Sequence, residues 1–519
     1  MGEPWILAVD LGTGGPKTGA ISLDGEILGY FARAVRTRYL PDGGAVQDPA
    51  DWWRAIVADA RKLIAARVAA PRDLVGVGIT GQWGSTVPVD ADGRAAGPCL
   101  LWSDTRGGWL ARRTVGGLLP VMGYSPANML RWIRITGGAP SPNGADPLGH
   151  EHYLRKHDAE TYAQAVALME PLDYLGLRFT GRRAATPASM ILSWLTDNRP
   201  GAPLGYVPEL VRRSRRDVSR LPELIPTGSV LGTIQPSVAD ELGLPQVPVV
   251  AGVPDLHTAF LGSGAVAPFQ GHITISTSSW IACEVPFKKT DVLHQMASVP
   301  GLRPNTYLIA NNHETAGICL QWVRDSFFST DSIQPPSYDE LTAMALGVPA
   351  GSNGVIFMPW LKGERTPVDD RTLRGGFINL SLNTDRATLV RAVLEGVAFN
   401  ARWLLDAVEG FAGKRLPALR ILGGGAASDL WCQVHADILE RRIERVAQPA
   451  VANLRGAALF AGISLGKLTL DDVRGLVKAD RVFEPVPATR SVYRPMYREY
   501  RGLYSRLHAV YARLNRGRG

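Results

Sequence analysis

Two segments that lie far apart in the chain share one design, in which a short apolar strand runs into a polar turn and then into a second strand. One segment covers residues 5–23 and the other covers residues 272–285. A strand–turn–strand unit that occurs twice indicates two domains of similar construction. The length of 519 residues agrees, because single hydrophobic cores rarely grow beyond about 250–300 residues. We expect the first domain to span residues 1–248 and the second to span residues 249–519.

The composition is that of a folded protein. Hydrophobic residues make up 45% of the chain and charged residues 20%, which excludes an intrinsically disordered chain. The four cysteines lie far apart and form no CxxC pair, so we expect neither a disulfide framework nor a structural zinc site. Asp10 interrupts the first apolar run, and no apolar segment reaches the length of a membrane span. We therefore expect a cytoplasmic protein that does not contact a membrane.

The formal net charge is +8 at neutral pH. Basic residues cluster only weakly, at residues 212–216 and near the C-terminal end. We interpret this pattern as a solvated basic surface. Binding of nucleic acid is an alternative that rests on the net charge alone, and we expect no nucleic-acid partner.

The alternation of short apolar strands with helical patterns predicts an α/β fold. Further strands are expected at residues 74–79, 87–89, 247–252 and 419–422, and helices at residues 49–68, 429–441 and 493–515. Residues 107–245 read as mainly helical and are broken by several prolines.

Glycine-rich turns follow several of these strands, and backbone N–H groups in such turns can converge on phosphate oxygens. Two familiar phosphate loops do not match, however. A Walker A loop needs glycine directly before the lysine–threonine pair, where Pro16 stands. Dinucleotide fingerprints that begin at Gly12 and Gly423 would need glycine where Lys17 and Ser428 stand.

Short motifs follow one another in a characteristic order along nearly the whole chain. They are Asp10-Leu11-Gly12-Thr13, Gln47-Asp48-Pro49, Gly78-Ile79-Thr80-Gly81-Gln82, residues 101–106, residues 249–255, residues 363–367, residues 394–397, Gly423-Gly424-Gly425-Ala426 and Gly456-Ala457-Ala458. Together and in this order they resemble the FGGY carbohydrate kinases, and within that family most of all the xylulokinases.

The resemblance implies two actin-like ATPase domains, each built on a ribonuclease H-like sheet, around a central cleft in which ATP and sugar meet. It implies ATP-dependent phosphorylation of a hydroxyl of a small sugar or polyol, with ATP and Mg²⁺ as cofactors. The leading candidate reaction converts D-xylulose to D-xylulose 5-phosphate. Glycerol, ribulose and other polyols stay open as substrates, as does a nucleotide-binding pseudokinase with a sensing role. The chain could also form a homodimer.

Two acidic residues carry the expected chemistry. Asp255 follows Gly252-Val253-Pro254 at the end of a buried strand, and by itself it could be the N-cap of a helix that starts at Leu256. The resemblance makes it the catalytic base. Asp10 would hold Mg²⁺, which prefers carboxylate oxygen, phosphate and retained waters. The alternative for Asp10 is a turn-forming residue after a strand.

The resemblance also assigns the binding residues. Those for ATP are Gly12, Thr13, Lys17, Thr277, Ser278, Gly424, Gly425, Ala426 and Asp429, and those for the substrate are Gln82, Trp83, Asp104 and Asp255. Three alternatives stay open. Lys17 could be an exposed hairpin residue, Asp104 could form a salt bridge to Arg106, and Trp83 could either stack on a sugar or only fill space.

The chain departs from the family pattern on both the sugar side and the phosphate side. After Gln82 the xylulokinases carry Met-His-Gly, whereas this chain has Trp83-Gly84-Ser85, and a Ser-Asp pair of the xylulokinases aligns with Ala188-Ser189. The family's second phosphate hairpin is usually Gly-Thr-Ser-Gly, and here it is residues 276–279. Pro16 removes an N–H from the first hairpin. The first two differences leave the identity of the sugar open, and the others could lower the affinity for ATP.

Overall fold

The computed structural model describes residues 2–116, 123–328 and 335–515. The chain forms two compact units. The first comprises Met1–Gly262, Val299–Thr306 and Asn453–Leu476, and the second comprises Ser263–Ser298, Tyr307–Ala452 and Val477–Gly519. The chain therefore passes from one unit to the other five times, after residues 262, 298, 306, 452 and 476.

The units do not divide where the sequence suggested, between residues 248 and 249. Strand pairing explains the difference, because β13 (Pro248–Val250) and β14 (Val253–Pro254) both pair in parallel with β6 (Leu74–Gly81). Residues 249–262 consequently belong to the first unit.

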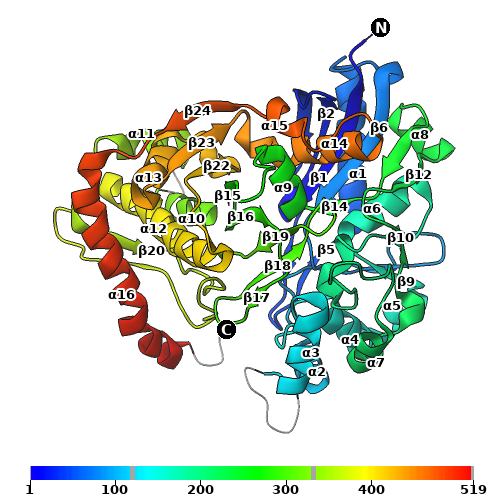
Figure 1. Cartoon of the computed structure of the whole chain (residues 1–519), viewed down its shortest axis with the longest axis horizontal. Helices are drawn as coiled ribbons and strands as arrows, with labels where there is room; N and C mark the ends of the chain where they lie inside the picture. The colour runs from blue at the N-terminus through cyan, green and yellow to red at the C-terminus, as the bar shows by residue number, and fades with distance from the viewer. Residues whose placement is uncertain (1, 117–122, 329–334, 516–519) are drawn as a thin grey trace. The chain divides into compact units, whose positions relative to one another are not determined.

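The sheet of the first unit has the strand order β12-β13-β6-β1-β2-β3 (Figure 1). The strands not yet defined are β1 (Trp5–Gly12), β2 (Gly15–Ser22), β3 (Ile27–Ala32) and β12 (Val230–Thr233). β1 runs antiparallel to β2 and parallel to β6. Since β1 has a partner on each side, it continues through Asp10 to Gly12, where the sequence had suggested a turn beginning at Asp10.

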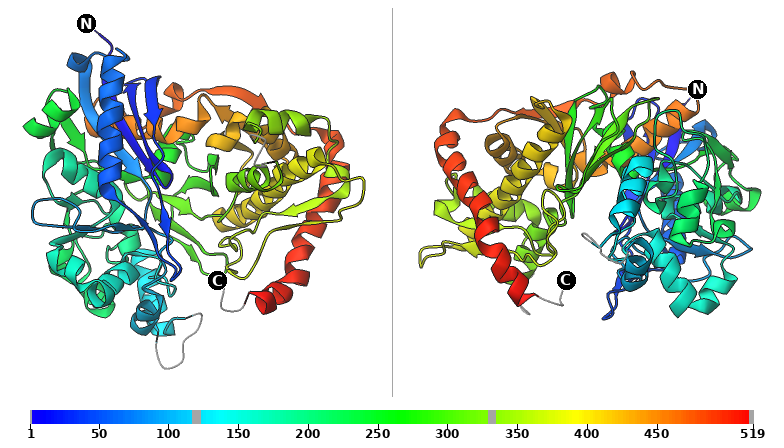
Figure 2. Two further views of the ribbon diagram at one scale, coloured as in Figure 1. Left: turned by 180° about the vertical axis from the view of Figure 1, so that it is seen from behind. Right: turned by 60° about the horizontal axis from the view of Figure 1, so that its bottom comes forward.

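Helices cover both faces of this sheet, which explains why every residue of β1 before Gly12 is buried. α1 (Pro49–Ala65) begins after Asp48, whose side chain accepts a hydrogen bond from the Ala50 N–H. It lies in front of the sheet in the left view of Figure 2. α14 (Ala452–Ser464) lies on the opposite face, in front of the sheet in Figure 1. Its backbone comes so close to β6 that a Cβ on Gly78 would collide with the Ala457 carbonyl.

Between β6 and β12 the first unit is mainly helical, as the sequence predicts. The elements are β7 (Val87–Val89), β8 (Cys99–Leu100), α2 (Gly108–Val115), α3 (Pro126–Thr136), α4 (Pro147–His157), α5 (Ala159–Gln164), β9 (Ala167–Met169), α6 (Pro171–Thr180), β10 (Ala184–Ala185), α7 (Pro208–Ser214) and β11 (Glu223–Leu224), and α8 (Pro236–Leu242) follows β12. Prolines that we expected to break this region start α7 and α8 instead. The first helical position suits proline, because the N–H that proline lacks would have no intrahelical partner there.

The second sheet has the order β17-β18-β19-β16-β15-β22-β23-β24. Its strands are β15 (Gly271–Ile275), β16 (Ser279–Val285), β17 (Thr290–Asp291), β18 (Met296–Pro300), β19 (Tyr307–Ala310), β22 (Ala418–Leu422), β23 (Arg442–Val446) and β24 (Ala479–Phe483). Here β15 runs antiparallel to β16 and parallel to β22. The arrangement around β15 thus repeats that around β1, which confirms the expectation of two similarly built units.

The described part of this unit contains the helices α10 (Gly317–Phe327), α11 (Tyr338–Leu346), α12 (Arg386–Ala412), α13 (Asp429–Leu439) and α16 (Arg490–Leu514). α12 is buried along most of its length. The terminal helix α16 contributes Tyr493, Tyr497 and Tyr500, whose rings all contact Phe399 of α12. Their spacing places them on one helix face, so the sequence correctly indicated an amphipathic terminal helix.

The short elements that remain are β4 (Arg38–Tyr39), β5 (Ala45–Gln47), β20 (Ile356–Met358), β21 (Gly376–Ile378) and α15 (Val473–Leu476). All four cysteines are buried and free. Within the described residues, no helix combines the length and the hydropathy needed to span a bilayer.

Candidate active site

The first phosphate hairpin predicted from the sequence joins β1 to β2 through a two-residue turn, Thr13–Gly14. Gly15 follows the turn at φ +127°, and a Cβ there would collide with the Arg33 carbonyl, so only glycine fits. The segment after β3 supports the hairpin from behind, because the Val35 N–H donates to the Gly14 carbonyl at 2.9 Å.

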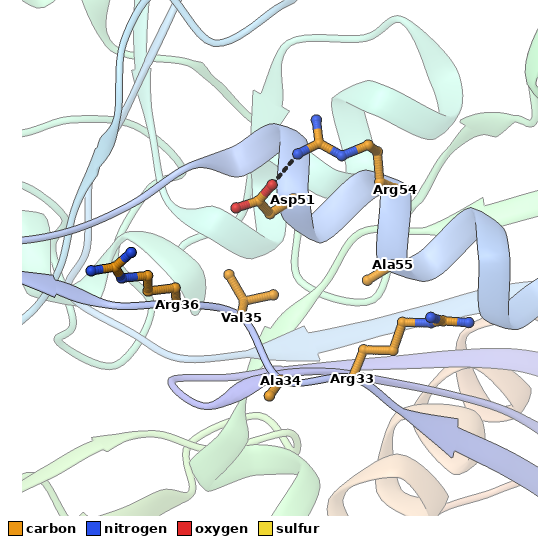
Figure 3. A pocket seen from close by; sticks show the side chains of 7 residues that line it. All are labelled: Arg33, Ala34, Val35, Arg36, Asp51, Arg54 and Ala55. Atoms are coloured by element: carbon orange, nitrogen blue, oxygen red, sulfur yellow. Dashed lines mark hydrogen bonds and ion pairs between the residues drawn. The ribbon is translucent and has the colours of Figure 1, made fainter.

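A surface hollow of about 280 Å³ lies beside this supporting segment (Figure 3). Its lining consists of Arg33, Ala34, Val35, Arg36, Asp51, Arg54 and Ala55. Figure 3 shows that Arg54 pairs with Asp51 on α1. None of the residues that the sequence singled out for catalysis or binding lines this hollow, and we assign it no part in the reaction.

Asp10 and Lys17 face each other across the hairpin. They are register partners on β1 and β2, and Lys17 Nζ lies 3.1 Å from Asp10 Oδ2. Asp10 is almost completely buried, whereas the Lys17 side chain is 32% exposed. The Asp10 carboxylate raises the pKa of Lys17. Lys17 is therefore a fixed positive charge at the hairpin and not a free surface lysine.

Asp255 is the first residue of α9 (Asp255–Ser263), directly after β14. β14 pairs with Thr80 and Gly81 at the end of β6, and β6 is the parallel neighbour of β1. Burial raises the pKa of Asp255 to about 7, and the Asp10 carboxylate adds to this effect. The Leu256 N–H and Lys17 oppose it. Asp10, Lys17 and Asp255 thus form one electrostatic cluster, which brings together the two acids that the sequence predicted.

Two threonines that the sequence did not mark as functional hold the start of α9. Thr80 Oγ1 donates to the Val253 carbonyl at 2.8 Å and lies 2.9 Å from Thr258 Oγ1. Thr258 in turn lies 3.2 Å from the Asp255 carbonyl oxygen. These buried hydroxyls fix the turn from β14 into the helix and with it the position of Asp255. Only Thr80 stood inside a recognised motif.

Gln82 follows β6 and is only 4% exposed. Its N–H donates to the Leu11 carbonyl at 2.8 Å, but both polar atoms of its side-chain amide are buried and have no partner in the described protein. Buried amides almost always find hydrogen-bond partners. The side chain is therefore suited to donate to and accept from a bound hydroxylated ligand.

Trp83 and Asp104 are both engaged within the protein. The Trp83 Nε1–H donates to the Ser189 carbonyl at 3.1 Å. The fully buried Asp104 carboxylate accepts from the Ala45 N–H at 3.0 Å and from Arg106 Nη2 at 2.7 Å. The salt bridge to Arg106, which was the alternative for Asp104, is present in the structure.

Thr13 is held from two sides. Its carbonyl accepts from Gln47 Nε2 at 2.7 Å, and its hydroxyl oxygen accepts from Trp102 Nε1 at 3.2 Å. The hydroxyl hydrogen of Thr13 stays available for donation to a phosphate oxygen. Gln47 and Trp102 lie in recognised motifs, but nothing in those motifs indicates this supporting role.

The second predicted hairpin, between β15 and β16, carries no charge in its turn at residues 276–278. Its carbonyls accept from the first N–H groups near α10: Ala316 donates to Thr277 at 2.9 Å and Gly317 donates to Ser276 at 2.7 Å. Thr277 is exposed and Ser278 is half-buried. Both residues are accessible to a ligand.

The triple glycine follows β22, the parallel neighbour of β15, so the glycine loop and the second hairpin lie at the same edge of this sheet. Gly423 has φ +94°, and a Cβ there would collide with the Ile275 carbonyl. Gly424 has open space around it, whereas Ala426 is buried. Asp429 starts α13, and its carboxylate pairs with Arg445 at 2.6 Å and with Arg481.

The donor set around Asp10 suits a metal that arrives with the nucleotide. Among the described residues, no group of three or more His, Cys, Asp or Glu side chains could hold a metal ion by itself. Mg²⁺ is commonly bound by one or two carboxylates, phosphate oxygens and waters. Asp10 supplies one carboxylate of this kind, and a bound nucleotide would supply the phosphate oxygens.

Two family models match the chain. The N-terminal domain model of the FGGY family of carbohydrate kinases matches residues 5–115, and the C-terminal domain model of that family matches residues 277–465. Together they cover more than half of the sequence. The chain belongs to the FGGY family of carbohydrate kinases. It is therefore a phosphotransferase that acts on an alcohol group of a sugar, and the predicted family and enzyme class are confirmed.

Relatives match along nearly the full length. A xylulose kinase of Staphylococcus epidermidis is 27% identical over 98% of both chains. A gluconokinase of Bacillus subtilis is 24% identical over 95% of this chain and 94% of its own. Among solved structures, a ligand-bound xylulose kinase from Lactobacillus acidophilus superposes with a TM-score of 0.83 at 21% identity, covering 98% of this chain and 100% of that one. The fold is that of the FGGY sugar kinases, as predicted.

Proposed function

We propose that the protein transfers the γ-phosphoryl group of Mg²⁺-ATP to a hydroxyl of a small sugar, with D-xylulose as the leading substrate and D-xylulose 5-phosphate as its product. The observation that carries this proposal is the cluster of Asp10, Lys17 and Asp255 in the first unit. Such a cluster offers a base, a fixed positive charge and a carboxylate for a nucleotide-bound metal.

Asp255 is the proposed general base. A base works best when its pKa lies near the working pH, and the pKa of Asp255 is about 7. In the reaction the Asp255 carboxylate takes the proton of the sugar hydroxyl. The hydroxyl oxygen then bonds to the γ-phosphorus, the bond from that phosphorus to the bridging oxygen breaks, and ADP leaves. The position of Asp255 at the start of α9 is compatible with this role. One oxygen of its carboxylate can accept from the Leu256 N–H while the other faces the substrate.

The remaining predicted residues position the phosphates. In the first unit, Asp10 would hold Mg²⁺, and Gly12, Thr13 and Lys17 would contact phosphate oxygens through backbone N–H, hydroxyl and ammonium groups. In the second unit, we propose nucleotide contacts by Thr277, Ser278, Gly424, Gly425, Ala426 and Asp429. Catalysis of phosphoryl transfer rests largely on such positioning and on the neutralisation of phosphate charge.

Gln82 is the proposed centre of sugar recognition, because its buried amide can both donate to and accept from hydroxyl groups. Trp83 stands beside it in the chain, and its indole N–H is already bound to Ser189. Asp104 could offer a sugar hydroxyl only a lone pair that Ala45 and Arg106 leave unused. We therefore assign Gln82 a larger share of the binding than Asp104.

A coupled assay of ADP formation with a panel of acceptors tests the proposal. The panel contains D-xylulose, D-ribulose, glycerol, D-gluconate and xylitol, each with Mg²⁺-ATP, and reactions without acceptor are the blank. We expect acceptor-dependent ADP release that is fastest with D-xylulose. Faster turnover of another sugar would replace D-xylulose as the substrate. ATP binding with no turnover of any acceptor would favour the pseudokinase.

A further inference from the structure

Glu170 is a buried carboxyl group that neither the family motifs nor the proposed chemistry accounts for. It stands between β9 and α6 and is 2% exposed. Its Oε2 accepts from two consecutive backbone N–H groups, those of Gly84 at 3.0 Å and Ser85 at 3.1 Å. These two residues directly follow Gln82 and Trp83, so Glu170 binds the backbone of the segment that carries the proposed sugar contacts.

The same segment is held at a second point by the first turn of α6. Asp173 is 3% exposed, and its carboxyl interacts with the side chain of Ser189. The Ser189 carbonyl accepts from the Trp83 indole. Residues 83–85 and residue 189 are positions at which the chain departs from the xylulokinase pattern. The structure brings these departures into contact with each other, and Glu170 and Asp173 lie where they meet.

Hydrogen bonds continue from this segment toward the first phosphate hairpin. Ser85 Oγ accepts from the Trp102 N–H at 3.0 Å, and Trp102 Nε1 donates to Thr13 Oγ1 at 3.2 Å. Glu170 is thus connected to Thr13 through Ser85 and Trp102. The part of the site nearest to Glu170 is nevertheless the sugar side, because Gln82 and Trp83 lie immediately before the residues that it binds.

Among the described residues, four of the buried polar atoms that have no hydrogen-bond partner belong to this segment and to the two acids beside it. They are Gln82 Oε1, Gln82 Nε2, Glu170 Oε1 and Asp173 Oδ2, all buried. Burial raises the pKa of Glu170 well above its usual range, the Asp173 carboxyl adds to the effect, and Arg216 opposes it. Carboxyl groups are rarely buried without a positive partner. Because these two carboxyl groups lower stability, their presence beside the proposed sugar-binding segment indicates a functional role.

We propose that Glu170 is a positioning residue that holds segment 82–85 in the conformation that binds the acceptor sugar. This inference rests on the proposed function and names the group that supports its sugar site. Gly84 has φ +77°. The buried N–H groups of Gly84 and Ser85 both donate to the Glu170 carboxyl group. Without the carboxyl group the segment loses two backbone hydrogen bonds at once, and Gln82 loses its fixed orientation toward the sugar.

The test compares Glu170→Ala with Glu170→Gln in the full-length protein. The glutamine carbonyl can still accept from Gly84 and Ser85, whereas alanine cannot. We expect Glu170→Ala to raise the KM for the acceptor sugar about 30-fold while the KM for ATP and the kcat change less than about threefold. Glu170→Gln should restore the KM for the sugar to within about threefold of wild type. Glu160→Ala, on the exposed side of α5, is the matched control and should change nothing.

Hydrogen–deuterium exchange of the peptide that contains residues 82–86 gives a readout that does not depend on turnover. We expect faster exchange at Gly84 and Ser85 in Glu170→Ala and near-normal exchange in Glu170→Gln. If Glu170→Ala fails to fold, Glu170→Asp replaces it, because the shorter side chain keeps a carboxyl group but withdraws it from both N–H groups.

Three results would overturn the inference. One is unchanged exchange at Gly84 and Ser85 in Glu170→Ala. Another is an equal rise of the KM for sugar and for ATP, and the third is a glutamine variant as impaired as the alanine variant. If the wild-type enzyme phosphorylates no sugar of the panel, the proposed function fails, and the exchange measurement alone then decides whether Glu170 holds the segment.

Discussion

The two hairpins, β1–β2 and β15–β16, occupy the same place in their sheets but carry different chemistry. Each has one strand with a parallel neighbour, β6 or β22, and one with an antiparallel neighbour, β3 or β19. Counted from the turn, the third pair of the first hairpin is Asp10 with Lys17, whereas that of the second is Ile273 with Ile281. An ion pair in one unit thus corresponds to a fully apolar pair in the other.

The difference shows how one sheet design supports two tasks. In the first unit the strand next to β6 leads into Asp255, so an acid joins the ion pair of the hairpin. In the second unit the strand next to β15 leads into glycines that leave backbone atoms accessible. Burying charged groups costs desolvation free energy, so an apolar pair at the same place is often at least as stabilising as an ion pair. We infer that the first unit carries the chemistry and that the second contributes backbone and hydroxyl groups to the nucleotide.

The strongest test of this comparison removes the carboxyl group of Asp255, which we assign as the base in the first unit. Asp255→Asn keeps the shape of the side chain but cannot take a proton. We expect kcat to fall by about 10²–10⁴-fold, the usual contribution of a general base, while ATP binding measured by calorimetry stays close to wild type. Asp240→Asn on the exposed side of α8 is the control. A variant at position 255 that retains near-normal turnover would refute the assignment of the base.

The same substitution should stabilise the protein at high pH. The pKa of Asp255 is about 7 in the folded protein, against an ordinary value of 3.8. The folded state therefore binds this proton more tightly than the unfolded state, so the contribution to stability is complete below about pH 4 and is lost as the pH rises to 7. Asp255→Asn avoids the loss, which amounts to at most about 4 kcal/mol above pH 7.

Denaturant unfolding at pH 5 and pH 8 measures this effect. The gain in the free energy of unfolding of Asp255→Asn over wild type should be larger at pH 8. Equal gains at both pH values would show that the carboxylate of Asp255 is not destabilised by burial. Ile273→Val in the second hairpin should show no such pH dependence, because no titrating group is changed.

Lys17 connects the hairpin to the base, and its removal should change the pH dependence of the reaction. In wild type, kcat/KM for the sugar should rise with pH through about 7, since Asp255 must be ionised to accept a proton. Lys17 lowers the pKa of Asp255, so Lys17→Met should move the midpoint to higher pH. Lys17→Arg keeps the charge and should leave the midpoint close to wild type. An identical midpoint in all three proteins would show that Lys17 does not influence the ionisation of the base.

The smallest effects are expected in the second hairpin. Thr277→Ala and Ser278→Ala each remove one accessible hydroxyl and no charge. We expect the KM for ATP to rise about 2–13-fold, equivalent to the 0.5–1.5 kcal/mol of a typical hydrogen bond, with the KM for sugar unchanged. Steady-state kinetics with each substrate varied in turn measures both values. A larger loss in these variants than in Asp255→Asn would reverse the assignment of tasks to the two hairpins.

The sequence was a good guide to elements whose signal is local. The strands at residues 74–79 and 419–422 and the helix that begins at residue 49 follow from apolar runs and helical spacing, and the structure has them. The placement of Asp10 inside β1 could not be predicted in this way, because it depends on pairing with two other strands. The predicted boundary at residue 248 differs from the division into compact units for the same reason. β13 and β14 pair with β6, a strand that lies about 170 residues earlier in the chain.

Glu170 and Asp173 were missed for a different reason. In the sequence they stand before and within the first turn of a helix, where acidic residues are ordinary. Only their position within an otherwise apolar run, residues 165–177, could have marked them as buried. The orphaned amide of Gln82 likewise becomes visible only when its surroundings are known, although the motif had already selected the residue.

The return of residues 453–476 to the first unit has a consequence for biosynthesis. α14 covers one face of the first sheet, and its Arg455 donates to the Gly25 carbonyl at 2.9 Å. Leu454 of α14 packs beside Gly19 of β2, and Ala457 packs beside Gly78 of β6, so a nascent chain that ends at Gly262 lacks the helix that covers this part of the sheet. The first unit can therefore complete its core only after α14 has been synthesised and has packed on the sheet, although almost all of its other residues precede Gly262.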